Sequence, residues 1–198
     1  MEIQYRGLEV KMDKAIKKYQ ITEYPWTTNG YTPKVEITFG YDKDGFEVLF
    51  TIYENEIRAI ETEHQTDVYC DSCVEFFVQF SPLTDKTYIN FEANANGAMF
   101  CAKGTARENR TLISVADIRD FNIHTKREQN YWQVGYFIPL AFIQREIPSY
   151  EHKENATIKC NFYKCGAKTK YPHHGCWKKV ETPKPDFYRP EFFGEIRL

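Results

Sequence analysis

The sequence has almost no excess of charge of either sign. Its 198 residues carry 26 Lys and Arg against 28 Asp and Glu, which gives a formal net charge of −2. A protein that neutralises nucleic-acid phosphates needs a basic surface, so nucleic acid is not an expected partner. No stretch approaches the roughly 18 consecutive apolar residues of a membrane-spanning helix, so no membrane partner is expected either.

The N-terminal residues lack the features of a secretion signal. Residues 1–18 mix charged and apolar side chains and contain no hydrophobic stretch of about 7–15 residues. We therefore expect a cytoplasmic protein if Met1 is the native start. If a signal has been trimmed, we expect an extracellular one.

The six cysteines do not follow the spacing of a zinc site. Cys70 and Cys73 have C-x-x-C spacing, but a strand directs residues three apart to opposite faces. Cys160 and Cys165 have no histidine pair at the spacing of a zinc finger, although Cys176 lies near His173 and His174 in the sequence, so reduced structural thiols are the preferred interpretation. Adjacent His173 and His174 are a weak metal candidate with Asp186, because neighbouring histidines seldom converge on one ion. No cofactor is expected.

What the sequence has in excess is aromatic side chains, and they follow the period of β-strands. Phe, Tyr and Trp make up 16% of the residues, with 15 Phe, 14 Tyr and 3 Trp. Apolar and polar residues alternate in five segments, each of which is predicted to be a strand with a buried face. These segments are residues 46–53, 73–80, 88–94, 131–138 and 157–163. Asp42–Gly45 and Asn94–Gly97 carry the residues of tight turns.

These patterns favour an all-β fold, an antiparallel β-sandwich of jelly-roll type with a few short helical turns. Helical periodicity is weak, and only Val10–Tyr19 and Leu140–Arg145 predict a turn or two each. No repeat or linker divides the chain, so residues 1–198 are predicted to form a single domain. Residues 164–191 form a long C-terminal loop rich in proline. Long irregular segments in compact domains are usually functional.

Polar strand faces and loop aromatics together supply the groups that a sugar site needs. The flat C–H surfaces of a pyranose pack on aromatic rings, while its hydroxyls take carboxylate and amide partners. The candidates of this kind are Tyr69, Glu75, Glu92, Asn94 and Trp177. On inventory alone, solvated strand positions are the simpler interpretation of the two glutamates. Composition supports a packing role for Trp177 as well as a binding role.

Two other functions stay open at this point. Glu75 and Glu92 could act as the acid and nucleophile of a small glycoside hydrolase if they lie roughly 5–9.5 Å apart. No G-x-S-x-G, H-E-x-x-H or P-loop motif is present. The second alternative is a structural or protein-interaction sandwich without sugar binding, because a fold does not fix a function.

Five segments resemble, in order, the motifs of carbohydrate-binding module family nine, over about residues 45–198. Residues 69–77 resemble its aromatic-x-D-S-x-V-E strand, and Trp177 with residues 185–194 resembles its closing W…P-D-F-x-x-P-x-x-F-G signature. The other three matches are residues 88–97, 132–139 and 161–165. Each match is weak by itself, and their shared order makes the resemblance specific.

The resemblance implies a non-catalytic β-sandwich that binds the ends of glucan or xylan oligosaccharides. It also implies a role in polysaccharide degradation. Such modules accompany xylanase-type glycoside hydrolases or stand alone outside the cell. The sugar is held between two aromatic rings within a polar rim. By position, the rings are Tyr69 and Trp177, and the rim is Glu75, Glu92, Asn94, Asn161 and Tyr163.

Two positions depart from the better-known members of the family. Tyr69 stands where they have Trp, and Glu92 stands where they tend to have Arg, which reverses the charge beside the ligand. Some members bind structural calcium. This sequence has no D-x-D-x-D loop that would place such a site.

Overall fold

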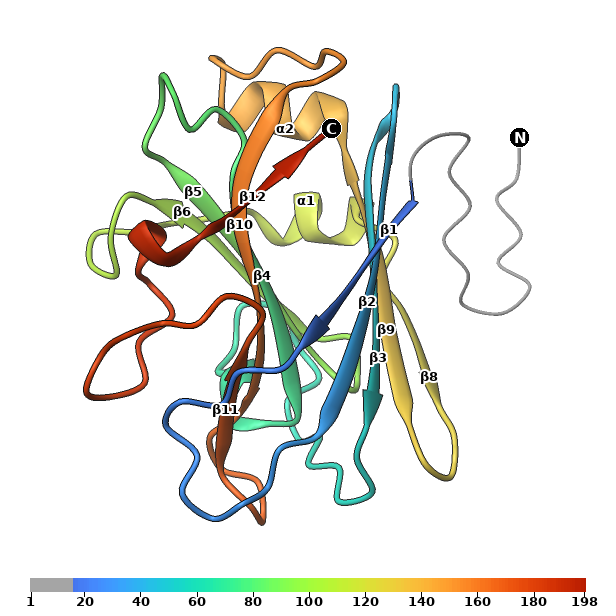
Figure 1. The fold of residues 1–198 in the computed structure, drawn as a ribbon. Helices are drawn as coiled ribbons and strands as arrows, with labels where there is room; N and C mark the ends of the chain where they lie inside the picture. Colours follow the sequence, from blue (N-terminus) through green and yellow to red (C-terminus); the bar gives the residue numbers. More distant parts are fainter. Residues whose placement is uncertain (1–15) are drawn as a thin grey trace.

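The computed structural model describes residues 16–198, which form two antiparallel β-sheets packed face to face (Figure 1). The prediction of an all-β sandwich with few helices is confirmed. Among the described residues, the first sheet has the strand order β1-β2-β3-β9-β8. Its strands are β1 (Ile16–Ile21), β2 (Lys34–Asp42), β3 (Gly45–Tyr53), β9 (Trp132–Pro139) and β8 (His124–Arg127).

The second sheet has the order β11-β10-β4-β5-β6-β7, and β12 also pairs with β10. Its strands are β4 (Cys73–Gln79), β5 (Tyr88–Asn94), β6 (Met99–Gly104), β7 (Thr111–Leu112), β10 (Thr157–Gly166), β11 (His173–Cys176) and β12 (Gly194–Arg197). β11 pairs with residues 163–166 of β10 and β12 with residues 157–160 of the same edge. The loop between β11 and β12 therefore begins and ends beside the same edge of β10.

Helical structure is short. The 3₁₀ turns are η1 (Val68–Cys70) and η2 (Pro190–Phe192), and the α-helices are α1 (Val115–Asp120) and α2 (Leu140–Glu146). The helical turn predicted at Leu140–Arg145 is confirmed. Within residues 16–198, neither α-helix has the length or apolar run that crossing a membrane requires.

The helical turn predicted at Val10–Tyr19 is wrong where it can be compared with the structure. Residues 10–15 lie outside the described part of the chain, and residues 16–19 belong to β1. All six residues of β1 pair with β2, and Tyr19 packs 5.6 Å from the ring of Phe162. Tertiary packing thus outweighs a weak local helical preference.

Both predicted turns are present, and side chains stabilise them. Asp42 Oδ1 accepts from the backbone N–H groups of Asp44 and Gly45 at the β2–β3 hairpin, at 2.8 and 3.3 Å. Between β5 and β6, Gly97 has a φ of 82°, which glycine adopts without steric cost. Asn94 Oδ1 accepts from the N–H groups of Asn96 and Ala98, both at 3.0 Å.

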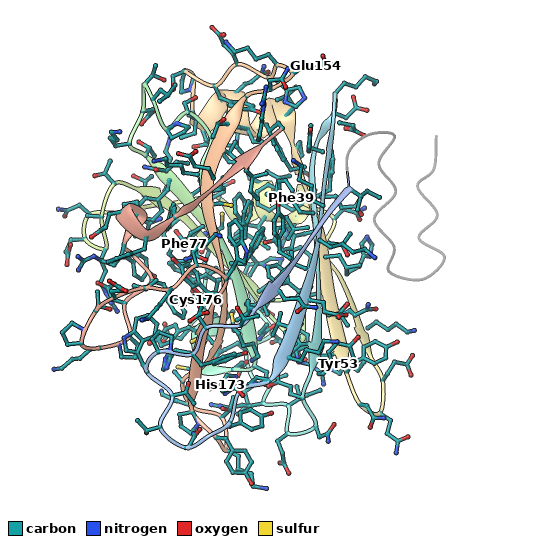
Figure 2. All side chains as sticks on the ribbon, in the orientation of Figure 1. Phe39, Tyr53, Phe77, Glu154, His173 and Cys176 are labelled. Carbon is teal, nitrogen blue, oxygen red and sulfur yellow. The ribbon has the colours of Figure 1, made fainter. Side chains whose placement is uncertain are left out.

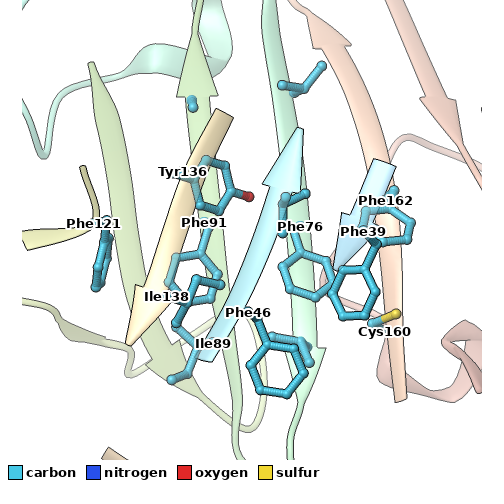
Figure 3. Close-up of a cluster of buried hydrophobic side chains, with 14 of the residues drawn as sticks. Phe39, Phe46, Phe76, Ile89, Phe91, Phe121, Tyr136, Ile138, Cys160 and Phe162 are labelled. Carbon is cyan, nitrogen blue, oxygen red and sulfur yellow. The ribbon is translucent and has the colours of Figure 1, made fainter. Parts of the chain in front are cut away.

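Aromatic side chains from both sheets fill the space between them (Figure 3). Phe39 of the first sheet lies 5.8 Å from Phe76 of the second, and Phe76 stacks on Phe162 at 4.9 Å. Trp132 is fully buried, as predicted, and its Nε1–H donates to Glu54 at 2.7 Å. The alternating apolar faces of β4, β5, β9 and β10 all contribute to this core.

A second apolar layer covers the outer face of the second sheet. In Figure 2, Phe77 and Cys176 lie on this side and Phe39 lies between the sheets. Side chains of the C-terminal loop, among them Val180 and Phe187, pack here against Phe77. The C-terminal segment runs over this face in Figure 1. The sheet is therefore buried on both faces, which is why β4 and β5 are buried along their whole length.

The cysteines behave as predicted for structural thiols. All six are free and buried. In residues 16–198, no group of three His, Cys, Asp or Glu side chains could hold a metal ion. His173 Nδ1 instead contacts the carbonyl of Tyr171 at 2.7 Å, and Asp186 contacts Arg107 at 3.3 Å.

Candidate functional site

A pocket of about 230 Å³ opens on the outer face of the second sheet, beneath the C-terminal loop. Its floor comes from β4, β5 and β10, and its walls come from η1, β11 and two loops. The lining residues are Tyr69, Glu75, Glu92, Arg107, Cys165, His174, Pro185, Phe187 and Tyr188. Segments distant in the sequence thus meet around one cavity.

Strand register places the two glutamates of the floor side by side. Glu75 of β4 lies directly opposite Glu92 of β5 in the antiparallel ladder. Directly opposite residues have Cβ atoms about 5 Å apart and project from the same face. Glu75 is 2% exposed and Glu92 is 3% exposed. The floor therefore presents two adjacent carboxyl groups with little access to bulk water.

Glu92 is held by hydrogen bonds from two neighbours. Asn90 Nδ2 donates to its Oε1 at 2.8 Å, and the Tyr188 hydroxyl donates to the same oxygen at 3.3 Å. Arg110 Nη2 in turn donates to Asn90 Oδ1, so the guanidinium acts on Glu92 through the amide. Burial raises the pKa of Glu92 to about 7, although these donors and Arg110 favour the ionised form.

Glu75 is equally buried and has different neighbours. Burial raises the pKa of its carboxyl well above the ordinary value of 4.5, and the neighbouring Glu92 raises it further. Lys164 and the Cys165 thiol oppose this shift. Lys164, however, is already paired with Glu54 at 3.3 Å. Two carboxyl groups that share a desolvated site do not both ionise readily, so near neutral pH the pair retains a proton.

Tyr69 forms the exposed aromatic wall of the pocket. Its side chain lies on η1 and is 44% exposed, although most aromatic residues of the chain are buried. The backbone holds it in place, because the Tyr69 carbonyl accepts from the N–H of Ala167 at 3.2 Å and the Cys165 thiol at 3.4 Å. A ring of this kind offers a face to a ligand at little cost in stability.

The opposite wall is formed by residues 185–188 of the C-terminal loop. Phe187 stacks on Tyr163, with ring centroids 4.1 Å apart and planes inclined by 10°. Tyr188 packs edge-on against Phe77 at 5.2 Å. At the rim, Arg107 pairs with Asp186 at 3.3 Å and lies over the Tyr188 ring at 5.0 Å. The loop is thereby tied both to the sheet and to the β6–β7 connection.

His174 of β11 lines the pocket on the side of Cys165, its register partner on β10. Burial lowers the pKa of His174, and the positive charge of Lys164 lowers it further. A neutral imidazole has one donor and one acceptor nitrogen. His174 can therefore take part in hydrogen bonding with a ligand without adding charge at neutral pH.

Three of the residues predicted for the site, Tyr69, Glu75 and Glu92, line this pocket together. Tyr163 lies beneath the wall, where it is fully buried, stacks on Phe187 and donates its hydroxyl to the Phe187 carbonyl at 3.1 Å. It supports the pocket without lining it.

The two predicted asparagines make structural contacts. Asn94 Nδ2 donates to the Glu61 carbonyl at 2.8 Å and to Asp71 at 2.9 Å, in addition to its contacts in the β5–β6 turn. Asn161 pairs with both the N–H and the carbonyl of Lys178, at 2.9 and 2.8 Å. It thus clamps the C-terminal loop where the loop leaves β11. Neither side chain lines the pocket.

Trp177 does not line this pocket either. Its ring packs 4.8 Å from Tyr19 and 5.7 Å from Phe162, at the edge of the main core. Lys178 Nζ lies 4.5 Å from the ring centroid, and the ring also borders Gly194, where an added Cβ would come within 2.8 Å. Trp177 borders a separate hollow beside β1 and β2. The structure therefore does not bring Trp177 and Tyr69 to one pocket.

The sequence interpretation missed six lining residues: Arg107, Cys165, His174, Pro185, Phe187 and Tyr188. Five of them, all except Arg107, lie in the recognised long loop of residues 164–191. Arg107 lies in the β6–β7 connection and follows no pattern. Only the folded arrangement shows that it reaches the rim.

The two carboxyl groups lie next to each other on the floor and do not face each other across the cavity. A glycoside hydrolase needs its two carboxyl groups on either side of the scissile bond. Glu75 and Glu92 project side by side from adjacent strands into one floor.

The comparison with protein-family models agrees with this geometry. The model of carbohydrate-binding family 9 matches residues 7–198. The chain belongs to carbohydrate-binding family 9, whose members are non-catalytic modules.

Solved structures share the fold. A protein from Bacteroides uniformis, with a provisional assignment as carbohydrate-binding, is 27% identical, with a TM-score of 0.79 over 92% of this chain and 86% of its own. A family 9 module from Caldicellulosiruptor kristjanssonii, solved with cellotriose, is 14% identical with a TM-score of 0.64, covering 92% and 82% of the two chains. The glucose complex of a family 9 module from that organism has the same identity and TM-score, covering 97% and 92%. No curated protein sequence matches the chain.

Proposed function

We propose that the chain binds a carbohydrate in the pocket between Tyr69 and residues 185–188. The observation that carries the proposal is the combination, in a member of a carbohydrate-binding family, of an exposed aromatic wall with two carboxyl groups on the floor. Aromatic faces pack against pyranose C–H groups, and carboxyl groups accept or share hydrogen bonds with hydroxyls. The pocket offers both interactions within one cavity.

Each lining group has a distinct role in the proposed complex. Tyr69 supplies the stacking face, and Glu75 and Glu92 bind adjacent hydroxyls of one sugar ring. Tyr188 orients Glu92 through its hydroxyl, and His174 offers a neutral hydrogen-bonding group. The Phe187–Tyr163 stack fixes the wall opposite Tyr69. In this arrangement the second ring of the clamp belongs to residues 185–188.

The proposed ligand is the end of a glucan or xylan oligosaccharide. The structurally similar family 9 modules solved with cellotriose and glucose support the same class. The proposed partner is accordingly a glycoside hydrolase that acts on the same polysaccharide.

Isothermal titration calorimetry with glucose, cellotriose and xylotriose tests the proposal. We expect dissociation constants on the order of micromolar to millimolar, because a small polar ligand gains little beyond its ordering and desolvation costs. Tyr69→Ala should weaken binding at least about tenfold, the effect of roughly 1.4 kcal/mol of lost contact. Tyr53→Ala is the matched control, because Tyr53 is 40% exposed on β3 and does not line the pocket. Equal affinities of Tyr69→Ala and the wild type would show that the pocket is not the binding site.

A further inference from the structure

The floor of the pocket carries more negative than positive charge. Glu75 and Glu92 lie directly opposite each other, and each is at least 97% buried. Like charges directly opposite each other on a sheet destabilise it, and burial adds a desolvation penalty. A fold that retains such a pair in a ligand pocket has a functional reason to do so more often than a structural one.

One guanidinium partly compensates this pair. Arg110 donates to Asn90, whose amide donates to Glu92 at 2.8 Å, so one positive charge lies one hydrogen-bonded residue away from Glu92. Arg110 also lies 4.5 Å above the Tyr88 ring, which fixes it outside the cavity. It contacts neither carboxyl group of the floor directly.

The other nearby cations are engaged elsewhere. Arg107 at the rim pairs with Asp186 at 3.3 Å. Lys164 of β10 pairs with the buried Glu54 at 3.3 Å and donates to the Cys165 carbonyl at 2.9 Å. His174 is neutral at ordinary pH, because burial lowers its pKa. Of these cations in the described residues, only Arg110 has no carboxylate partner. If Glu75 and Glu92 are both ionised, their two negative charges and the one positive charge of Arg110 leave a net charge of −1.

A proton or a bound cation can neutralise that remaining charge. In the free protein a proton retained by one of the two carboxyl groups does so, in agreement with the raised pKa values of both. An ammonium group in the same place would donate up to three hydrogen bonds and bring a full charge, whereas a sugar hydroxyl donates one hydrogen bond and no charge. Charge-assisted hydrogen bonds are roughly twice as strong as neutral ones.

We propose that the pocket prefers an amino sugar, bound with its ammonium group between Glu75 and Glu92, over the neutral sugar of the same shape. This inference rests on the proposed function and narrows its ligand class. The ammonium takes the place of the retained proton, so binding near neutral pH releases a proton to solvent. No bond to carbon forms or breaks.

Calorimetry near pH 7 tests the preference with glucose and its 2-amino, 3-amino and 6-amino deoxy derivatives, since any of these ring positions can face the floor. The N-acetylated forms are the neutral controls. We expect at least one amino sugar to bind about tenfold more tightly than glucose, as one charge-assisted hydrogen bond in a desolvated site warrants. Titrations in two buffers with different heats of ionisation should show proton release for the amino sugar alone.

Two variants connect the preference to the floor. Glu75→Gln and Glu92→Gln each remove a charge with little change of shape, and each should abolish the preference for the amine. Glu195→Gln removes the same charge from the exposed surface of β12 and should leave the preference intact. Glucose binding with no tighter amino sugar would overturn this inference and leave the proposed function standing. If neither neutral nor amino sugars bind, the proposed function itself fails.

Discussion

Replacing Glu92 by Gln should make the protein more stable at alkaline pH and leave its stability nearly unchanged in acid. Gln keeps an oxygen that can accept from Asn90 and Tyr188, so the substitution removes the charge and keeps the acceptor. Burial raises the pKa of Glu92 in the folded protein from 4.5 to about 7. The folded state therefore binds this proton more tightly than the unfolded state does.

The sign and size of the effect follow from this difference in pKa. The contribution of Glu92 to stability is fully present below pH 4.5 and is lost as the pH rises to about 7. At about 1.4 kcal/mol per pH unit, the loss approaches 3 kcal/mol. Because Glu75 shares the site, the measured value belongs to the pair and not to Glu92 alone.

Urea unfolding followed by tryptophan fluorescence, without ligand, measures the effect between about pH 5 and pH 8. Both proteins share the histidines and all other titratable groups. Their contributions therefore cancel in the difference between the unfolding free energies of the wild type and Glu92→Gln. We expect this difference to grow in favour of the variant as the pH rises. Parallel stability curves across the whole range would refute the argument that the buried pair retains a proton.

Three further predictions concern the residues around the pocket. Trp177→Ala should destabilise the fold by about 3 kcal/mol, because its ring packs on Tyr19 and Phe162, and should leave the sugar affinity of the folded protein within about twofold. Asn94→Ala should cost about 2 kcal/mol in urea unfolding, because buried Asp71 and the β5–β6 turn lose their partner; an effect below about 0.5 kcal/mol would contradict this. None of the six thiols should react rapidly with a thiol reagent in the native state, and all six should react in denaturant.

The sequence interpretation predicted long strands with alternating apolar residues such as β4 and β5, but it missed β2, in which Val35, Ile37 and Phe39 alternate with polar residues. It missed β11 and β12, since four residues are too few for a periodic pattern. It also missed β8, an edge strand with the polar sequence His-Thr-Lys-Arg, which has no buried alternating face. Pairing with β9 alone defines that strand.

The candidate site was predictable where its residues lie on regular strands. Glu75 and Glu92 were found from a motif and an alternating polar face, and strand register then brought them together. Trp177 shows the limit of such reasoning. It directly follows β11, so its direction depends on how that strand pairs with β10, and the ring turns toward Tyr19 and away from the pocket. Tyr188 lies in a loop whose return path no local pattern defines.

The attachment of β11 and β12 to one edge of β10 has a consequence for how this family could diversify. The residues between β11 and β12 form a segment that evolution could exchange. Both ends of the segment are held by strands that pair with β10, and β10 lies outside the exchanged sequence. A replacement segment must still supply apolar side chains in place of Val180, Phe187 and Phe193, which cover the sheet. Grafting residues 177–193 between relatives should therefore change the wall opposite Tyr69, while Tyr69, Glu75, Glu92 and the sandwich itself are conserved.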